Sequence, residues 1–384
     1  MNLLYEKRRK FFMDVAQGKG AAPGCVQIVI THFLPDRPEL LEAFSSVMPI
    51  ITLVAIPYSI VPEVLAQLKT IYNVVTPTLQ ELRDEQYMLG LVRSAAKNHP
   101  EARIVLNEIG GYFAPFLKSI AGEFGATIAG CVEDSQNGHA RYENARPLPY
   151  PVISVARSAL KEGEDTLVGP SCYFSADRLM RALGVLLAPR RALIVGYGKV
   201  GRGMAFSLQD NGCTPLVYDI NPIRNGVAHG DGMFIPDRKA ALMGCDVIFG
   251  CTGVTSVGGS DFNLLDDGCF LVSCSSKDIE FDLKTLSTGF VKTPLIPNVD
   301  KFTSSRTGKT IYLLGNGTPV NFLDGAVFGP ALTLVQAELI VAVAGVVDLT
   351  ADGDLTEIGV DERKKIAGGW QAEFIDPNTG SFPY

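Results

Sequence analysis

Four polar residues in the first 150 positions stand where apolar runs end, and their side chains are of the kinds that transfer protons. They are His32, Glu108, Glu133 and Asp134. Apolar runs that alternate with amphipathic stretches predict the parallel strands of an open α/β sheet with helices on both faces. Ligands bind such sheets beyond the carboxyl ends of the strands. The four side chains are therefore candidates for acid–base chemistry by position, although a histidine at a strand end is more often structural.

A lysine and an aspartate lie four residues apart in SALKEGED, at Lys161 and Asp165. On one helix face this spacing gives a surface ion pair that contributes a few tenths of a kcal/mol. Gly163, between them, disfavours a long helix at this point. A lysine that lies near a carboxylate and a bound cation can have a pKa suited to proton transfer. The spacing alone leaves both interpretations open.

The stretch GYGKVG has the glycine spacing of a dinucleotide-binding turn. Gly196 permits the tight turn, Gly198 lets the backbone approach a pyrophosphate, and Gly201 allows close helix–strand packing. The motif follows an apolar strand, opens a helix and precedes a second strand that ends in Asp219. That carboxylate lies about twenty residues on, where ribose hydroxyls are held. No arginine directly follows Asp219, so the sequence predicts NAD rather than NADP.

Two further loops fit the same cofactor. CTG carries Thr252 and Gly253 just after a strand, where dinucleotide folds pass the backbone near the cofactor. LLGNGTPVNF offers the amide side chains of Asn316 and Asn321. Glycine and asparagine also simply build turns, so these residues by themselves support the two interpretations equally.

The remaining composition excludes several classes of function. The eight cysteines form no C-x-x-C pair and no Cys/His set of zinc spacing, so we predict no metal site. Most lie among apolar neighbours, which predicts buried reduced thiols and a reducing compartment. A net charge of −7 argues against a nucleic-acid partner, and the run EKRRK (6–10) is typical of a solvated helix face.

Two apolar stretches, 47–68 and 329–349, have to be weighed as membrane spans. The first contains three prolines and a glutamate, and the second contains Gln336 and Glu338, so neither is a clean span of about twenty apolar residues. We expect a buried strand, a loop and a helix start in the first. In the second we expect a buried helix with small residues. The start of the sequence lacks a signal-peptide pattern, so we predict a cytoplasmic protein with no membrane partner.

The pattern of elements predicts an α/β protein with two doubly wound parallel-sheet domains, the second a Rossmann domain. The three prolines of ARPLPYPVIS (145–154) suggest a linker. We expect a substrate domain over 1–155 plus about 325–350, an NAD-binding domain over 156–324, and a carboxy-terminal tail over 351–384.

Four motifs resemble those of the S-adenosyl-L-homocysteine hydrolases, also called adenosylhomocysteinases. They are GYGKVGRGMA, YDINPI (218–223), IPNVDKF (296–302) and LLGNGTPVNF (313–322). The resemblance covers about residues 25–345 and is strongest over 191–322. It implies an enzyme with tightly held NAD that transiently oxidises the ribose 3′-hydroxyl of a nucleoside, removes the 4′ proton and releases the 5′ thiol. It also implies a homodimer or homotetramer.

The resemblance assigns roles to individual positions. Catalytic roles fall on His32, Asp134, Lys161 and Asp165. Substrate-binding roles fall on Asp36, Glu108 and Glu133. Cofactor-binding roles fall on Ser135, Gln136, Asn137, Gly196, Gly198, Lys199, Val200, Gly201, Asp219, Ile220, Thr252, Gly253 and Asn321.

The sequence also departs from the family pattern. Ile109 precedes the glycines of NEIGG where the family has aspartate, Leu34 replaces a threonine, and Ser276 replaces the histidine of G-H-F-D. The reaction could therefore be hydrolysis, or it could stop at elimination, as in a lyase or dehydratase. Two other classes stay open: an NAD-dependent oxidoreductase of a small hydroxy compound, and a catalytically silent NAD-binding homologue.

Overall fold

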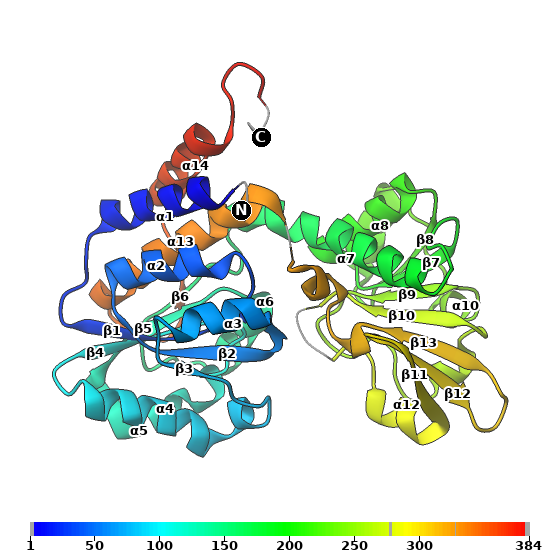
Figure 1. The fold of residues 1–384 in the computed structure, drawn as a ribbon, viewed down its shortest axis with the longest axis horizontal. Coiled ribbons are helices and arrows are strands. Elements are labelled where there is room, and N and C mark those ends of the chain that lie inside the picture. Colours follow the sequence, from blue (N-terminus) through cyan, green and yellow to red (C-terminus); the bar gives the residue numbers. More distant parts are fainter. Residues whose placement is uncertain (1–3, 276–278, 327, 381–384) are drawn as a thin grey trace. The chain divides into compact units, whose positions relative to one another are not determined.

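The computed structural model describes residues 4–275, 279–326 and 328–380, and these fall into two compact units (Figure 1). The first unit comprises residues 1–161 and 329–384, and the second comprises 162–328. The chain therefore leaves the first unit once and returns to it. The outgoing boundary lies after Lys161, a few residues beyond the position we expected.

The first unit is built on a seven-stranded sheet in which every pair of neighbouring strands is parallel. Its spatial order is β14 (Leu355–Thr356), β6 (Val152–Ser154), β5 (Ile128–Glu133), β4 (Arg103–Glu108), β1 (Cys25–Phe33), β2 (Ile50–Ile60) and β3 (Val74–Val75). All nine residues of β1 are buried, as expected for a parallel strand covered on both faces. The register places Glu108 beside Ile30 on one side and beside Glu133 on the other, so the candidate residues gather at one edge.

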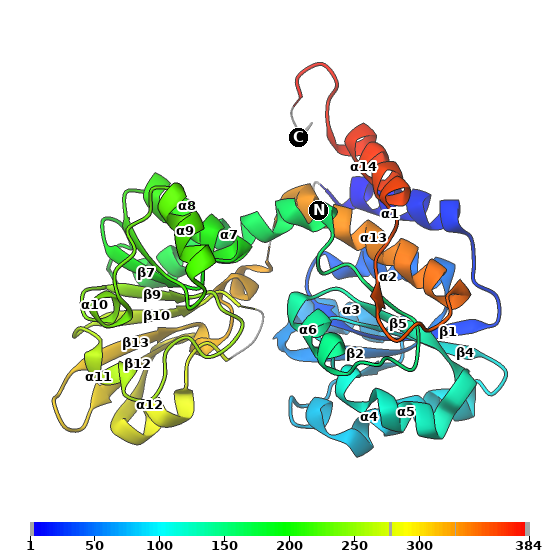
Figure 2. The ribbon, with the colours of Figure 1, turned by 180° about the vertical axis from the view of Figure 1, so that it is seen from behind.

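Helices cover both faces of this sheet. Figures 1 and 2 show α1, α2, α13 and α14 above the sheet and α4 and α5 below it. The helices of the first unit are α1 (Tyr5–Lys19), α2 (Arg37–Val47), α3 (Pro62–Lys69), α4 (Glu85–Asn98), α5 (Leu117–Phe124), α6 (Gln136–Asn144), α13 (Leu332–Gly345) and α14 (Val360–Phe374). Short 3₁₀ helices connect them: η1 (Glu81–Arg83), η2 (Ala114–Phe116), η3 (Gly125–Thr127), η4 (Ala159–Lys161), η7 (Gly329–Ala331) and η8 (Val346–Asp348).

The second unit also has a seven-stranded sheet, and its core is parallel. Its order is β11 (Phe290–Ile296), β12 (Val299–Ser304), β13 (Thr310–Leu314), β10 (Cys269–Ser273), β9 (Val247–Gly250), β7 (Arg191–Val195) and β8 (Thr214–Tyr218). The pairs β11–β12 and β12–β13 are antiparallel, and the others are parallel. Its helices are α7 (Glu162–Ala182), α8 (Lys199–Asp210), α9 (Pro222–Gly230), α10 (Arg238–Leu242), α11 (Asp261–Leu264) and α12 (Leu283–Gly289), with 3₁₀ helices η5 (Gly315–Gly317) and η6 (Val320–Asp324). The α/β class with two doubly wound, mainly parallel sheets is thus confirmed.

The apolar stretch near residue 340 forms α13, which is buried on all sides as expected. Within the described residues, Gly329–Asp348 is the one helical stretch long and apolar enough to cross a membrane. Because 72% of that stretch is buried inside the protein, it has the character of a core helix. The cysteines also behave as expected: all eight are free, and seven are buried.

Three local expectations were wrong because tertiary contacts override the local pattern. Gly163 does not interrupt a helix, since α7 begins at Glu162 and continues for 21 residues. The proline-rich segment 145–154 is not a linker, because its last residues form β6 beside β5 in the first sheet. Arg8, in the charged run of α1, is not solvated but buried against Glu39 of α2.

The segment 351–384 also differs from the free tail that we expected. Its residues form β14, which pairs with β6 at the edge of the first sheet, and α14, which packs on α1 and α13. The indole nitrogen of Trp370 donates a hydrogen bond to the carbonyl of Pro330, 2.9 Å away. The described part of this segment therefore belongs to the first unit.

Helices α7 and α8 of the second unit approach each other through two glycines. A Cβ atom on Gly169 would lie 2.2 Å from the backbone nitrogen of Met204. A Cβ atom on Gly203 would lie 2.3 Å from the carbonyl oxygen of Thr166. Both contacts are with backbone, which cannot move aside easily, so this interface requires glycine at both positions.

The interface predicts opposite effects for two substitutions in one helix. Gly169→Ala should lower the free energy of unfolding by about 1–3 kcal/mol, since the added methyl group overpacks the contact with α8. Gly163→Ala, where a Cβ atom meets nothing within 4 Å, should raise it by up to about 0.5–1 kcal/mol. Calorimetric unfolding of the full chain measures both. An unchanged transition for Gly169→Ala would contradict this view of the interface.

Candidate functional site

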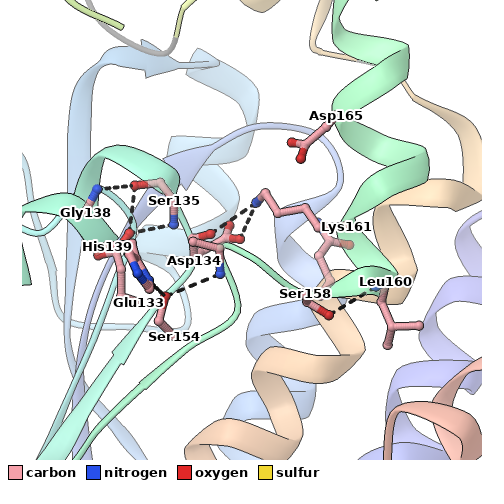
Figure 3. Close-up of polar contacts among 12 residues, drawn as sticks. Glu133, Asp134, Ser135, Gly138, His139, Ser154, Ser158, Leu160, Lys161 and Asp165 are labelled. Carbon is pink, nitrogen blue, oxygen red and sulfur yellow. Dashed lines mark hydrogen bonds and ion pairs between the residues drawn. The ribbon is translucent and has the colours of Figure 1, made fainter. Parts of the chain in front are cut away.

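A buried ion pair between Lys161 and Asp134 forms the centre of the candidate site in the first unit. Lys161 Nζ lies 2.7 Å from Asp134 Oδ1 and 3.2 Å from the Asp134 carbonyl oxygen (Figure 3). The two residues are only 8% and 7% exposed. Burial opposes ionisation of Asp134, but the charge and hydrogen bond of Lys161 outweigh it, so the pKa of this carboxyl is lowered. The pair is therefore a fixed ammonium–carboxylate contact at the end of β5.

The residue four positions after Lys161 has a different partner. Asp165 lies on the first turn of α7 in the second unit, and its Oδ2 is 3.1 Å from Nζ of Lys199. The surface pair between Lys161 and Asp165 that the spacing suggested is therefore wrong. Lys199 is the first residue of α8, directly after the glycine turn. The catalytic role assigned to Asp165 by resemblance stays a prediction.

His32 is buried near the carboxyl end of β1, where its ring is held by a serine. Nδ1 shares a hydrogen bond with Oγ of Ser59, and that hydroxyl donates to the carbonyl of Ile56. The serine proton is thus used, which favours the tautomer with the imidazole proton on Nδ1. Burial, together with the charge of Arg37, lowers the pKa of His32 to about 3. At neutral pH the ring is therefore uncharged.

Glu133, by contrast, is engaged with backbone. Its carboxylate accepts hydrogen bonds from the N–H groups of Gly110 (3.0 Å), Gly111 (2.8 Å) and Ser135 (2.6 Å). A Cβ atom on Gly138 would lie 2.0 Å from Cδ of Glu133, so the start of α6 closes tightly over the carboxylate. In the described structure this side chain holds the loop that follows β4 rather than facing outward.

Glu108 holds the next part of the same loop. It accepts hydrogen bonds from the N–H groups of Tyr112 and Phe113 and from the Tyr142 hydroxyl. Burial and the nearby charge of Glu133 raise the pKa of Glu108 above its ordinary value of 4.5. Burial likewise raises the pKa of Glu133. These two carboxyls therefore act as buried supports for the loop, and Asp134 is the carboxylate that reaches a charged partner.

The glycine turn of the second unit meets the steric demands of a dinucleotide site. Gly196 has φ of +96°, and a Cβ atom on Gly201 would lie 1.9 Å from the Gly196 carbonyl oxygen. At Gly198 a Cβ atom would meet nothing within 4 Å, so the backbone there faces open space. Asp219, at the end of β8, accepts a hydrogen bond from Tyr197 N at 2.6 Å. This leaves a backbone surface at the start of α8 that a pyrophosphate can approach.

The predicted cofactor loop that carries Thr252 and Gly253 is held by a residue that the sequence did not lead us to predict. The fully buried Glu280 accepts hydrogen bonds from the N–H groups of Thr252 (2.7 Å) and Gly253 (2.6 Å). A charged residue between two apolar residues, Ile279 and Phe281, was the available signal. Asn321 is also buried, and its Oδ1 has no hydrogen-bond partner within the described part of the chain. An amide held in this way fits a ligand that offers donors, as a carboxamide does.

The remaining predicted positions lie at the ends of elements. Lys199 and Val200 begin α8, and Ile220 follows β8 with 89% of its surface exposed. Ser135, Gln136 and Asn137 lie in the first unit at the start of α6, where the Ser135 hydroxyl caps the helix by accepting from Gly138 N. Asp36 accepts a hydrogen bond from Gln336 of α13. Ser276 lies outside the described residues. The substrate-binding role of Asp36 remains a prediction, and so do the cofactor-binding roles of the other described positions named here.

Comparisons with known proteins agree with the glycine turn. Residues 172–327 match the family model for the NAD-binding domain of S-adenosyl-L-homocysteine hydrolase. An adenosylhomocysteinase of Pyrococcus abyssi is 30% identical over 203 residues, which cover 51% of this chain and 47% of that protein. One from Saccharolobus solfataricus is 31% identical over 236 residues, covering 60% and 55%. The chain thus spans about half the length of the curated relatives it matches.

A solved glyoxylate reductase from Paecilomyes thermophila overlaps 89% of this chain and all of its own, at 12% identity and a TM-score of 0.42. So loose an overlap says nothing about activity. The glycine turn, the parallel sheet and the family match together define the second unit as an NAD-binding Rossmann domain. Over the matched residues this chain is thus similar to the NAD-binding domain of the adenosylhomocysteinases.

The glycine turn yields a prediction that separates binding from folding. Gly198→Val should leave the unfolding transition near that of the wild type, because the side chain enters open space. It should cut the NAD content of the purified protein at least about tenfold, because the side chain blocks the approach to the backbone. Gly201→Ala should lose NAD and stability together. Full NAD content in Gly198→Val, measured after denaturation, would contradict the assignment.

The buried glutamates predict how stability depends on pH. Because its pKa is raised, Glu108 holds its proton in the folded state, and the stability this contributes is present below the ordinary value of 4.5. It is lost as pH rises through the raised pKa. The free energy of unfolding should therefore fall from about pH 5 to about pH 9, by up to about 1.4 kcal/mol per pH unit for each titrating group.

Glu108→Gln, which cannot titrate, should show a shallower fall in urea-unfolding experiments across that range. Glu123→Gln is the matched control, because Glu123 is partly exposed and Arg93 lowers its pKa, so it is ionised throughout. This control should keep the wild-type slope. Equal slopes in Glu108→Gln and the wild type would show that Glu108 is already ionised in the folded protein.

Proposed function

We propose that the protein is an NAD-dependent enzyme that acts on adenosylhomocysteine or a related nucleoside by transient 3′-oxidation and 5′-elimination. The observation that carries the proposal is the buried Lys161–Asp134 pair near the neutral His32, in a chain whose second unit is an NAD-binding domain of this family. When bound, NAD takes a hydride from a substrate carbon and can return it. Gly196, Gly198 and Asp219 are the residues we assign to hold it.

Proton transfers are the part of this chemistry that the first unit would perform. We assign Lys161 Nζ to exchange a proton with the ribose, while Asp134 keeps the ammonium form stabilised and the side chain in place. His32 is uncharged at neutral pH, so it suits the role of a second acceptor near the same substrate carbon atoms. Once the 4′ C–H bond has lost its proton, the electron pair expels the 5′ substituent. Addition of water to the resulting double bond, with return of the hydride to the 3′ carbon, would complete a hydrolysis.

Three related outcomes differ in observable ways. An enzyme that stops at elimination would be a lyase or dehydratase and would accumulate the unsaturated nucleoside. An oxidoreductase of a small hydroxy compound would release NADH in proportion to product, and a silent homologue would bind NAD without turnover. The eight free cysteines support a cytoplasmic location. Oligomeric state follows from the resemblance alone, as a homodimer or homotetramer.

The test is loss of the 4′ hydrogen of adenosine in deuterated water, followed by NMR. This exchange needs oxidation and proton removal but presumes no leaving group. Lys161→Ala should slow the exchange about 100-fold or more, since it removes the proton-transfer group. Lys118→Ala, an exposed lysine of the same unit, is the control and should exchange at the wild-type rate.

Lys161→Ala also strands the buried charge of Asp134, which can destabilise the protein by about 3–5 kcal/mol. The double variant Lys161→Met/Asp134→Asn removes both charges and keeps the volume, so it should be more stable than Lys161→Ala while exchanging just as slowly. Exchange at the wild-type rate in this folded double variant would refute the assigned site.

A further inference from the structure

Arg37 is a buried cation, and two of its three guanidinium nitrogens have no hydrogen-bond partner within the described residues. It is the first residue of α2 and is 5% exposed, and its Nε and Nη1 have no hydrogen-bond partner within the described residues. A guanidinium cannot lose its charge in a protein, so burial without partners costs free energy that a bound group would recover. None of the sequence motifs pointed to this residue.

Three carboxylates near Arg37 contact other groups, although Oε2 of Glu39 has no hydrogen-bond partner within the described residues. Asp134 pairs with Lys161, and Glu39 pairs with Arg8. Asp36 lies 3.7 Å from Arg37 Nη1, which is beyond hydrogen-bond distance, and accepts instead from the side chain of Gln336. Within the described residues, Nε and Nη1 of Arg37 therefore remain buried without a hydrogen-bond acceptor.

The position of Arg37 connects these donors with the candidate site. Arg37 lies just after β1, at the same edge of the sheet as His32. Its charge lowers the pKa of His32, and it also contributes to the lowered pKa of Asp134, so the guanidinium lies within electrostatic range of both. The amino terminus of α2 adds partial positive charge at the same place. An anion bound here would lie near the groups to which we assign proton transfer.

We propose that Arg37 forms an oxyanion subsite and that the substrate is a nucleoside carrying a carboxylate or a phosphate. The fork of a guanidinium matches both groups, and neutral nucleosides offer nothing comparable. The identity of the substrate rests on the proposed function, whereas anion binding at Arg37 does not. An anionic substituent held at this point would also fix the orientation of the ribose relative to Lys161.

Direct binding tests the subsite without any reaction. Inorganic phosphate and acetate are titrated into the full-length protein, and binding is followed by calorimetry. We expect saturable binding of at least one of them, and the stronger one identifies the class of anion. Arg37→Gln should weaken it about tenfold or more, because charged hydrogen bonds are lost. Arg37→Lys should retain part of the affinity, since it keeps the charge but not the fork.

Arg93→Gln is the matched control, because it removes an exposed arginine of the same unit and should bind as the wild type does. Arg37→Lys also covers the case in which Arg37→Gln fails to fold. If phosphate and acetate both fail to saturate the wild type, Arg37 binds no anion and the proposal is overturned. Equal affinity in the wild type and a folded Arg37→Gln overturns it as well.

The 4′ hydrogen exchange assay then separates this inference from the proposed function. Adenosine is compared with adenosine 5′-monophosphate and adenosine 5′-carboxylic acid. Faster exchange of one anionic nucleoside, lost in Arg37→Gln, supports both proposals. Fast exchange of adenosine that is indifferent to Arg37 supports the function and refutes the subsite. Arg37-dependent anion binding without exchange of any nucleoside supports the subsite and refutes the function.

Discussion

The ion pair between Lys161 and Asp134 is the interaction on which the rest of the candidate site depends. Two charges removed from water are stable only when each has its partner in good geometry, and here the distance is 2.7 Å. The pair joins the end of β5 to η4, the last element before the chain leaves the first unit. The side chains of Glu133 and Asp134 have different roles: the first holds backbone N–H groups and the second meets the lysine. Structural support and chemistry are thus divided between neighbouring residues.

Much of the fold could be predicted because the central strands are buried on both faces. Such strands need nearly continuous apolar runs, so β1, β4 and β5 could be recognised from composition within a few residues. The glycine turn could be predicted for a related reason. Close backbone contacts there allow no side chain at Gly201. Any sequence that forms this turn therefore has glycine at the same place in the motif.

The rest depends on contacts between distant parts of the chain. Spacing suggested Asp165 as the partner of Lys161, but the partner comes from 27 residues earlier in the chain. Arg8 belonged to a run that local charge pattern assigns to the solvent, yet Glu39 of α2 compensates it inside the protein. The strand β6 follows a proline-rich segment, and only its neighbours β5 and β14 make it a strand. In each case the partner residue or neighbouring strand lies on another element of the chain. The local periodicity of the sequence carries no information about such partners.

The family match falls on the unit that carries the dinucleotide-binding turn. A dinucleotide is bound largely through backbone N–H groups, so its site is restricted by sterics at a few glycines and tolerates change elsewhere. That restriction lies within the matched residues 172–327. A substrate, by contrast, is selected by side chains, and Arg37 is the residue that we propose for this role in the first unit. We therefore expect a protein of this kind to keep its cofactor chemistry while its substrate changes. Arg37 belongs to the first unit, outside the residues that the family model matches.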